Sequence, residues 1–280
     1  MKGDLHCHTK VSDGSMGIEE VVSFAARRGL DFVAITDHDT MAGVTRACVV
    51  GKRQEIRVIP GVEITGWDYG RDRLVHMLCY LPKKPDRLET LFKRALDVRR
   101  EAIEYMLPIV MEHYPVTREQ VEKYASGSNV MHKVHIMHAL MDMGYTSSIF
   151  GELWGKLFSE GGLCCCEPKF TDIYEVLETI QSAGGVAVLA HPGRYQSFEL
   201  LEELAQKELI DGVEVWHPGN EWGEEEKLLY TAKCYGLITT GGTDFHGAYE
   251  CRATPIGTCT TPAASIQKII ACAEKKAKSL

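Results

Sequence analysis

The sequence lacks an excess of positive charge and any long apolar run. Its 31 Lys and Arg residues are outnumbered by 39 Asp and Glu residues, which gives a formal net charge of −8. This balance argues against an extended nucleic-acid groove, although a few local cations can still hold a small phosphorylated substrate. No segment approaches the roughly 18 apolar residues of a membrane helix. Because the first residues show no signal-peptide pattern, we expect a cytoplasmic protein with no membrane partner.

The chain also lacks the paired cysteines of a zinc ribbon or a redox motif. None of its 10 cysteines forms a Cys-x-x-Cys pair, and only Cys164, Cys165 and Cys166 are clustered. We therefore expect reduced thiols, mostly buried as small hydrophobes. With 45% hydrophobic residues, a chain of 280 residues is long enough for one large domain, or for one domain with an insertion.

Short β-branched segments alternate with amphipathic helical patterns along most of the chain. This alternation favours a mainly parallel α/β sheet or barrel. Seven strands are expected, at residues 4–8, 32–36, 56–64, 74–81, 186–190, 212–216 and 237–240. The expected helices are residues 18–28, 41–51, 172–183, 198–207, 224–235 and 263–278.

One region, residues 85–168, breaks this alternation. Its pattern is almost purely helical, with segments at 88–112, 118–124, 130–143 and 148–159. We interpret it as a helical insertion that divides a barrel into a first part, residues 1–84, and a second part, residues 169–280.

The positions of the histidines carry the strongest functional signal. Six of the 11 histidines lie at or just after predicted strand ends, and acidic residues accompany them. The histidines are His6, His8, His38, His76, His191 and His246, and the acidic residues are Asp13, Asp37, Glu63 and Asp244. In a parallel barrel the carboxyl ends of the strands converge on one face, so these residues would meet in one pocket.

The spacing and the residue types indicate a metal site. His6 and His8 are two positions apart, so on an extended strand both rings project from the same face, and Asp244 and His246 repeat this spacing. Imidazole with carboxylate is the donor set of Mn²⁺, Zn²⁺ or Fe²⁺, whereas Mg²⁺ and Ca²⁺ prefer oxygen alone. Because the donors exceed the needs of one ion, we predict two or three divalent ions, with Glu63 as the bridging carboxylate.

Seven motifs together resemble the PHP (polymerase and histidinol phosphatase) superfamily, in the order that this family shows them. They are His6-Cys7-His8, Ser12-Asp13-Gly14, Thr36-Asp37-His38-Asp39, Gly61-Val62-Glu63, Val75-His76, Ala190-His191-Pro192 and Thr243-Asp244-Phe245-His246. The resemblance implies a distorted (β/α)7 barrel of the TIM-like kind, with the helical insertion as a lid and with a trinuclear metal centre.

The same resemblance implies how nine residues share three ions. One site would use His6, His8, Glu63 and Asp244, a second Glu63, His76 and His191, and a third Asp13, His38 and His246. We take Mn²⁺ as the preferred ion, with Zn²⁺ and Fe²⁺ as alternatives.

Within the superfamily, the segment from Ala190 to Tyr195 resembles stand-alone phosphoesterases that act on nucleotides. These are the 3′,5′-nucleoside bisphosphate phosphatases and related exonucleases that trim short RNA. The lid helix is similar to theirs, but Lys133 stands where that group has arginine. A guanidinium binds phosphate in a bidentate manner, whereas an ammonium is a point charge, so the substrate assignment is weaker than the assignment of the chemistry.

We therefore predict a phosphoesterase in which a metal-activated hydroxide attacks the phosphate monoester of a small nucleotide, such as a nucleoside 3′,5′-bisphosphate, without a covalent intermediate. Trimming of short RNA is an extension of this prediction. Two alternatives stay open. One is a phosphatase for a non-nucleotide metabolite such as histidinol phosphate, and the other is a non-catalytic PHP module.

Four residues are predicted to act on the phosphate. Arg194, just past a strand, is the candidate clamp. Lys133 and His135 lie on the lid helix, and His135 is predicted to bind a phosphate or to protonate the leaving oxygen. His217 follows the sixth strand, as a phosphate contact, a proton donor or a support for another residue.

The remaining assignments are secondary. Asp37 is expected to orient a histidine that binds metal. Tyr195 and Trp154 are candidates for stacking on a base, whereas most buried aromatics only fill a core. His132 and His138 are interpreted as incidental histidines of the lid.

Overall fold

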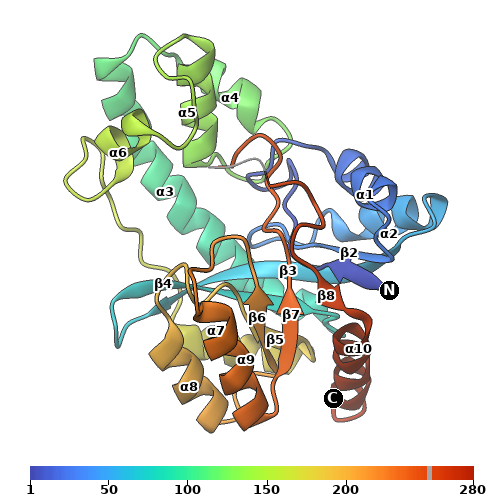
Figure 1. Ribbon diagram of the computed structural model, residues 1–280. Helices are drawn as coiled ribbons and strands as arrows, with labels where there is room; N and C mark the ends of the chain where they lie inside the picture. Colours follow the sequence, from blue (N-terminus) through green and yellow to red (C-terminus); the bar gives the residue numbers. More distant parts are fainter. Residues whose placement is uncertain (251–253) are drawn as a thin grey trace.

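An eight-stranded sheet curls into a nearly closed barrel in the computed structural model, which describes residues 1–250 and 254–280 (Figure 1). Its strands are β1 (Lys2–Asp4), β2 (Phe32–Ile35), β3 (Arg57–Asp68), β4 (Arg73–Tyr80), β5 (Val186–Leu189), β6 (Gly212–Trp216), β7 (Ile238–Gly241) and β8 (Thr261–Pro262). The order in the sheet is β7-β6-β5-β4-β3-β2-β1-β8. The predicted distorted (β/α)7 barrel is confirmed, with β8 as a short addition beside β1. Cys251, one of the cysteines expected to be reduced, lies outside the described residues.

The barrel closes where the chain beyond β7 meets the chain beyond β1. Cys7 and Phe245 form an isolated parallel bridge, and the N–H of His8 donates to the carbonyl of Phe245 at 2.8 Å. The buried carboxylate of Asp4 accepts a hydrogen bond from the N–H of Thr243 at 2.9 Å. These contacts hold the first and the last motif of the sequence next to each other.

Amphipathic helices cover the outside of the barrel. They are α1 (Ile18–Arg27), α2 (Val44–Arg53), α7 (Ile173–Ala183), α8 (Phe198–Gln206), α9 (Glu224–Tyr235) and α10 (Ala263–Ala277), and they differ from the predicted helices by a few residues at their ends. In α7, Ile173, Val176 and Ile180 lie on one face and join a core cluster with residues of β3, β4 and β5. In the described part of the chain, no helix has both the length and the apolar character needed to span a membrane.

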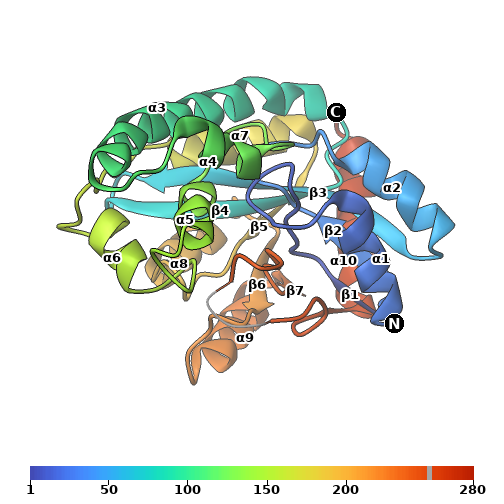
Figure 2. The same cartoon turned by 90° about the horizontal axis from the view of Figure 1, so that it is seen from above.

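Between β4 and α7 the chain forms a separate group of helices. They are the 3₁₀ helix η1 (Pro85–Leu88), α3 (Glu89–His113), α4 (Arg118–Ala125), α5 (Lys133–Asp142) and α6 (Glu152–Phe158). In Figures 1 and 2, α4, α5 and α6 gather around the outer end of α3, above the barrel. Leu107, Ile136 and Leu157 belong to a core of their own, which Tyr249 enters from the loop after β7. The boundaries 85–168 and the role as a lid stay predictions.

The strand β4 is an exception to the predicted parallel arrangement. It runs antiparallel to β3, with Thr65 opposite His76, and antiparallel to β5, with Met77 opposite Leu189. The reason is the connection, because only residues 69–72 join β3 to β4. A chain segment of this length makes a hairpin, whereas a parallel crossover needs about a dozen residues or more.

The hairpin, and not a parallel strand end, places Glu63 and His76 at the site. β3 continues to Asp68, so Glu63 lies inside the strand and not at its end, and His76 lies in the first half of β4. Because β4 is antiparallel, its first half lies at the same end of the barrel as the carboxyl ends of its neighbours. β1 in turn ends at Asp4, so His6 and His8 follow the strand.

Gly242 shows how tightly the closing segment packs on His6. A Cβ atom at position 242 would lie 2.2 Å from the Cβ of His6 and 2.5 Å from its backbone N. We expect Gly242→Ala to lower the free energy of unfolding by about 1–3 kcal/mol, because the extra methyl group overpacks this contact. Urea denaturation measures the change. Gly155→Ala is the control, since its methyl group would meet only the Oγ of Ser159, at 4.0 Å. Equal stability of the two variants would contradict the close packing.

Candidate metal centre

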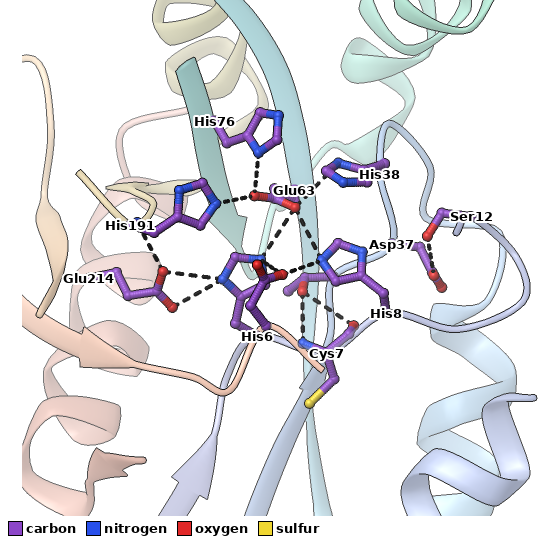
Figure 3. A network of polar contacts seen from close by, with 12 residues as sticks. His6, Cys7, His8, Ser12, Asp37, His38, Glu63, His76, His191 and Glu214 are labelled. Carbon is purple, nitrogen blue, oxygen red and sulfur yellow. Dashed lines mark hydrogen bonds and ion pairs between the residues drawn. The ribbon is translucent and has the colours of Figure 1, made fainter. Parts of the chain in front are cut away.

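Glu63 lies at the centre of the histidine cluster (Figure 3). Its side chain is buried, and each carboxylate oxygen faces a different set of imidazoles. Oε2 lies 3.3 Å from His6 Nε2, 3.1 Å from His8 Nε2 and 3.2 Å from His38 Nδ1, and Oε1 lies 2.8 Å from His76 Nδ1 and 2.9 Å from His191 Nε2. A carboxylate placed in this way can offer one oxygen to each of two ions.

Asp244 completes a first group of possible metal donors. Its Oδ1 lies 3.4 Å from His6 Nε2 and 3.2 Å from His8 Nε2. One donor atom from each of His6, His8, Glu63 and Asp244 lies within 4.8 Å of all the others, and the four side chains are buried. This group has the same four members as the first predicted site.

Two further groups share members with the first. Asp13 lies 3.4 Å from His246 and 3.6 Å from each of His8 and His38, and these four residues form one group. His38, Glu63 and His76 form another. The structure therefore brings the predicted residues together but places His8 and His38 in two groups each. His191 contacts Glu63 without joining a group, and the assignment of donors to ions stays a prediction.

The cluster contains buried polar atoms that lack a hydrogen bond. Among the described residues, these atoms are His6 Nε2, both ring nitrogens of His8, Asp13 Oδ1, and Nδ1 of His38, His76 and His191. Buried polar groups are rarely left without a partner, because desolvation is costly. Imidazole nitrogens and carboxylate oxygens are donors that divalent transition ions accept. The residues present therefore fit a cluster of divalent cations.

The three carboxylates of the cluster stay ionised although they are buried. Burial acts to raise the pKa values of Asp13, Glu63 and Asp244, but the surrounding imidazoles lower each of them well below its ordinary value. Burial acts to lower the pKa of His8, but Asp244 and Glu63 outweigh it and raise that pKa to about 10. Without cations, the negative charge is thus balanced by protons on imidazoles.

Glu214, to which the sequence analysis assigns no role, holds two of the histidines. The carboxylate is fully buried on β6, where Oε1 accepts a hydrogen bond from His6 Nδ1 at 3.0 Å and Oε2 accepts one from the backbone N–H of His191 at 2.9 Å. A proton on Nδ1 leaves the Nε2 lone pair of His6 directed at the cluster, as in carboxylate–histidine–metal triads. The sequence contained one signal for this role: Glu214 is a carboxylate inside an apolar strand, and a buried charge needs a partner.

Replacement of Glu214 by glutamine should weaken metal binding through His6 by about 10- to 100-fold, as expected when such a supporting carboxylate is lost. Activity measured against free Mn²⁺ should shift to higher concentration and recover at excess Mn²⁺. Glu225→Gln is the control, because Glu225 accepts a hydrogen bond from Trp216 at the end of the same strand but lies on the surface. An unchanged Mn²⁺ dependence for the Glu214 variant would contradict its role.

Asp37 fixes the loop that carries Asp13. It accepts hydrogen bonds from the N–H of Thr9 at 2.7 Å and from the hydroxyl of Thr9 at 2.8 Å. It also accepts one from the hydroxyl of Ser12 at 2.7 Å (Figure 3). The prediction that Asp37 orients a metal-binding histidine is therefore wrong for the part of the chain that the structure describes. The three donors of the neighbouring loop occupy its oxygens instead.

Arg194 and His217 contact Oδ2 of Asp244, whereas His6 and His8 lie near its Oδ1. Arg194 Nη1 lies 2.8 Å from Asp244 Oδ2, and the arginine side chain is 49% exposed, so solutes can reach it. His217 Nε2 lies 3.4 Å from the same oxygen, and its Nδ1 accepts the N–H of Gly219 at 3.0 Å. The proton of His217 therefore resides on Nε2, which makes this ring a hydrogen-bond donor toward the cluster.

Two neutral histidines lie at the start of α5, His132 just before the helix and His135 in its first turn. His132 Nδ1 lies 3.8 Å from Asp13 Oδ2, and its ring stacks at 6.3 Å on His38, so it is not incidental as expected. His135 Nδ1 accepts the N–H of His132 at 3.0 Å, which places its proton on Nε2. Burial lowers the pKa of His132 to about 3 and that of His135 to about 4.

Of the remaining residues considered from the sequence, only Tyr195 lies beside the cluster, and the others contact residues of the helical group or Tyr249. The Tyr195 ring stands edge-on to His76 at 5.2 Å, beside the cluster. Trp154 packs within the helical group, and His138 Nδ1 shares a hydrogen bond of 2.6 Å with the hydroxyl of Tyr249. The ammonium of Lys133 lies over a phenylalanine ring, and burial lowers its pKa.

The model of the PHP domain family matches residues 4–215 of the chain. The chain belongs to the PHP family. The motif order and the cluster geometry described above agree with this membership, which confirms the family resemblance predicted from the sequence.

Two relatives of this PHP protein are named for the reaction that they catalyse. The chain is 34% identical over 88% of its length to a phosphoribosyl 1,2-cyclic phosphate 1,2-diphosphodiesterase from Eggerthella lenta, of which it covers 94%. It is 26% identical over 88% of its length to a 3′,5′-nucleoside bisphosphate phosphatase from Chromobacterium violaceum, of which it covers 88%.

A solved structure is also similar to this PHP protein. A Bifidobacterium adolescentis protein described as a metal-dependent phosphoesterase matches with a TM-score of 0.89 and 29% identity, over 96% of each chain. Together these matches confirm the predicted barrel and the predicted enzyme class, a metal-dependent hydrolase of phosphoric esters. The alternative of a non-catalytic module is therefore set aside.

Proposed function

We propose that this PHP enzyme hydrolyses a phosphate monoester of a small nucleotide, such as a nucleoside 3′,5′-bisphosphate. The observation that carries the proposal is the buried Glu63 with five imidazoles around it, next to the exposed guanidinium of Arg194. A cation cluster beside a phosphate clamp suits hydrolysis of a phosphate ester. The names of the two relatives support a phosphorylated ribose compound as the substrate.

Divalent cations bound at this site supply an activated water and neutralise the phosphoryl oxygens. We propose that the three groups that contain Glu63, Asp13 or Asp244 hold them, with His191 as a further metal donor beside Oε1 of Glu63. Mn²⁺ is the proposed ion, with Zn²⁺ and Fe²⁺ as alternatives, because all three accept mixed imidazole and carboxylate donors. A cytoplasmic location is part of the proposal.

The chain's own residues bind and orient the phosphate. Arg194 offers its guanidinium to two phosphoryl oxygens, and His217 donates from Nε2. His135 is neutral above its pKa of about 4 and carries its proton on Nε2, so it serves better as a hydrogen-bond donor than as a general acid. We propose that residues 85–168 form a lid that brings His135 and Lys133 to the substrate.

A substrate panel with Mn²⁺ tests the proposal. Adenosine 3′,5′-bisphosphate, mononucleotides, short oligoribonucleotides and histidinol phosphate are compared by the phosphate or nucleotide released. The bisphosphate should give the highest kcat/KM, and short RNA should be trimmed more slowly. Turnover of histidinol phosphate alone would show that the nucleotide assignment is wrong.

A second candidate substrate is phosphoribosyl 1,2-cyclic phosphate. The 34% identity to a diphosphodiesterase that is named for this compound favours it. Adding the compound to the panel separates the two candidates. A kcat/KM for the cyclic phosphate well above that for the bisphosphate would select the second one.

A further inference from the structure

Tyr249 connects the loop after β7 with the helical group. It follows His246 by three positions, on a loop that rises from the barrel toward the helices (Figure 1). Its side chain is only 5% exposed and belongs to the apolar core of the helical group. In the part of the chain that the structure describes, it is the one member of that core from outside residues 102–166. A side chain from the barrel thus completes the core of the helices.

The Tyr249 side chain contacts two histidines on one face of α5. Its hydroxyl shares a hydrogen bond of 2.6 Å with His138 Nδ1, and its ring stands edge-on to the His138 ring at 5.3 Å. The His135 ring lies 6.2 Å away and is also edge-on to it. Because His135 and His138 are three positions apart, they are neighbours on the helix surface. Tyr249 therefore contacts a full turn of α5 and not a single side chain.

The contacts of His135 leave its ring little freedom. The residue is 1% exposed, its Nδ1 accepts the N–H of His132 at 3.0 Å, and the Tyr249 ring packs against it. Aromatic rings attract each other at this separation when one is edge-on to the other. The N–H of Nε2, which is the donor proposed for the phosphate, is thereby held in one direction.

The loop that carries Tyr249 is itself held on the barrel. The N–H of Ser15 donates to the carbonyl of His246 at 3.0 Å, and the N–H of Ala248 donates to the hydroxyl of Ser15 at 2.6 Å. Ser15 lies two positions after Asp13. The hydrogen bonds therefore join two segments that carry proposed metal donors, and Tyr249 extends from this junction to α5.

A second contact between the helical group and the barrel lies before α5. The hydroxyl of Ser128 donates to the carbonyl of Ser12 at 2.6 Å, and the N–H of Asn129 donates to the carbonyl of Val11 at 3.1 Å. A helix that is held only at the segment before it can pivot about that segment. Tyr249 supplies a contact within the helix, so the two contacts together define the orientation of α5.

We infer that Tyr249 is a positioning residue, which sets α5 on the barrel so that His135 meets the substrate phosphate. The inference rests on the proposed function, because that proposal makes His135 a donor to the phosphate. Loss of Tyr249 would misplace His135, so the two residues should act as one unit. A side chain that only fills the core would act independently of His135.

The test compares Tyr249→Phe and Tyr249→Leu on adenosine 3′,5′-bisphosphate with Mn²⁺. Phenylalanine removes only the hydroxyl that meets His138, and leucine also removes the ring beside His135. Tyr249→Phe should raise KM by about 2- to 10-fold, the effect of one hydrogen bond, and Tyr249→Leu should raise it further. The value of kcat should change less than about twofold, because phosphate binding is lost equally in the ground state and the transition state.

Tyr124→Phe is the matched control. The Tyr124 ring stacks on His138 at 3.8 Å, but its hydroxyl contacts only the exposed Lys123 among the described residues. Phenylalanine keeps the stacked ring, so this variant should behave as the wild type. Metal content and Tm, measured on every variant, report a general loss of structure. A KM change in Tyr249→Phe that is accompanied by loss of metal would overturn the inference.

A double-variant cycle with His135→Asn separates positioning from packing. His135→Asn should raise KM by about 10- to 100-fold, the effect of losing a hydrogen bond to a charged group. Adding Tyr249→Leu to it should raise KM less than about twofold more, because both changes act on the same contact. Tyr249→Phe takes the place of the leucine variant if the latter does not fold. Factors that multiply, or an unchanged KM in His135→Asn, would overturn the inference.

The outcomes also separate this inference from the proposed function. If the wild type does not hydrolyse the bisphosphate, the substrate proposal fails, and inorganic phosphate becomes the probe. Its dissociation constant, measured by calorimetry with Mn²⁺ present, then replaces KM in the same cycle. Effects that do not multiply support the inference. Effects that multiply, or a phosphate affinity that neither single variant changes, overturn it.

Discussion

Replacing Glu63 by glutamine should lower kcat by about a thousandfold or more, since metal ions stabilise the transition state by several kcal/mol and each 1.4 kcal/mol is a factor of ten. The two side chains have nearly the same shape, so the barrel should keep its packing. One oxygen becomes an NH₂ group, which cannot donate a lone pair to a cation. Because the two oxygens of Glu63 face different imidazoles, the change should affect more than one of the proposed ions.

Phosphate release and metal content, determined by elemental analysis, measure the effect of Glu63→Gln. Glu203→Gln is the control for loss of a carboxylate, because Glu203 pairs with Arg71 and Lys207 on the outside of the barrel. It should keep full metal content and activity. A Glu63 variant with wild-type metal content and activity within tenfold of the wild type would refute the bridging role.

The sequence predicts most of the cluster because barrel topology relates distant residues. His191 and His246 follow β5 and β7, and a parallel arrangement places the ends of these strands together. Glu63 and His76 were selected by the same rule, although the rule does not apply to them. They reach the site through an antiparallel hairpin, which the short connection at residues 69–72 requires.

The residues that the sequence did not reveal act through partners far away in the chain. His6 and Glu214 are 208 positions apart, and Tyr249 and His138 are 111 positions apart. Periodicity shows which face of an element a residue occupies, but not which side chain it meets across the barrel. A buried carboxylate such as Glu214 can be recognised as needing a partner, yet its partner is known only from the fold.

Asp37 shows the same limit at short range. The sequence placed it correctly beside a proposed metal ligand, His38, but its bonds go to Thr9 and Ser12. The loop that carries these donors also contacts the other end of the barrel, through the bridge between Cys7 and Phe245 and the hydrogen bond from the N–H of Ser15 to the carbonyl of His246 at 3.0 Å. A local pattern contains no information about that closure.

Removal of the divalent cations with a chelator should abolish phosphate release, and their return should restore it with the release of protons. Without cations, Asp244 and Glu63 overcome the effect of burial and hold the pKa of His8 at about 10, and Glu214 with Glu63 likewise raises that of His6 well above its ordinary value. His8 is therefore protonated at pH 7.5, and the protonated form of His6 is favoured as well. Binding to a cation requires the neutral imidazole, so protons should leave when the cations bind, and metal affinity should rise with pH.

Calorimetric titration of the chelated protein with Mn²⁺, in two buffers that differ in ionisation enthalpy, measures this release. The heat should differ between the buffers, and the difference should be smaller in His6→Ala, which lacks one of the two rings. The control Glu203→Gln, on the outside of the barrel, should leave the proton release unchanged. Heats that do not depend on the buffer would mean that the imidazoles are already neutral. Protons on His6 and His8 would then not balance the buried carboxylates of Glu63 and Asp244 that they contact.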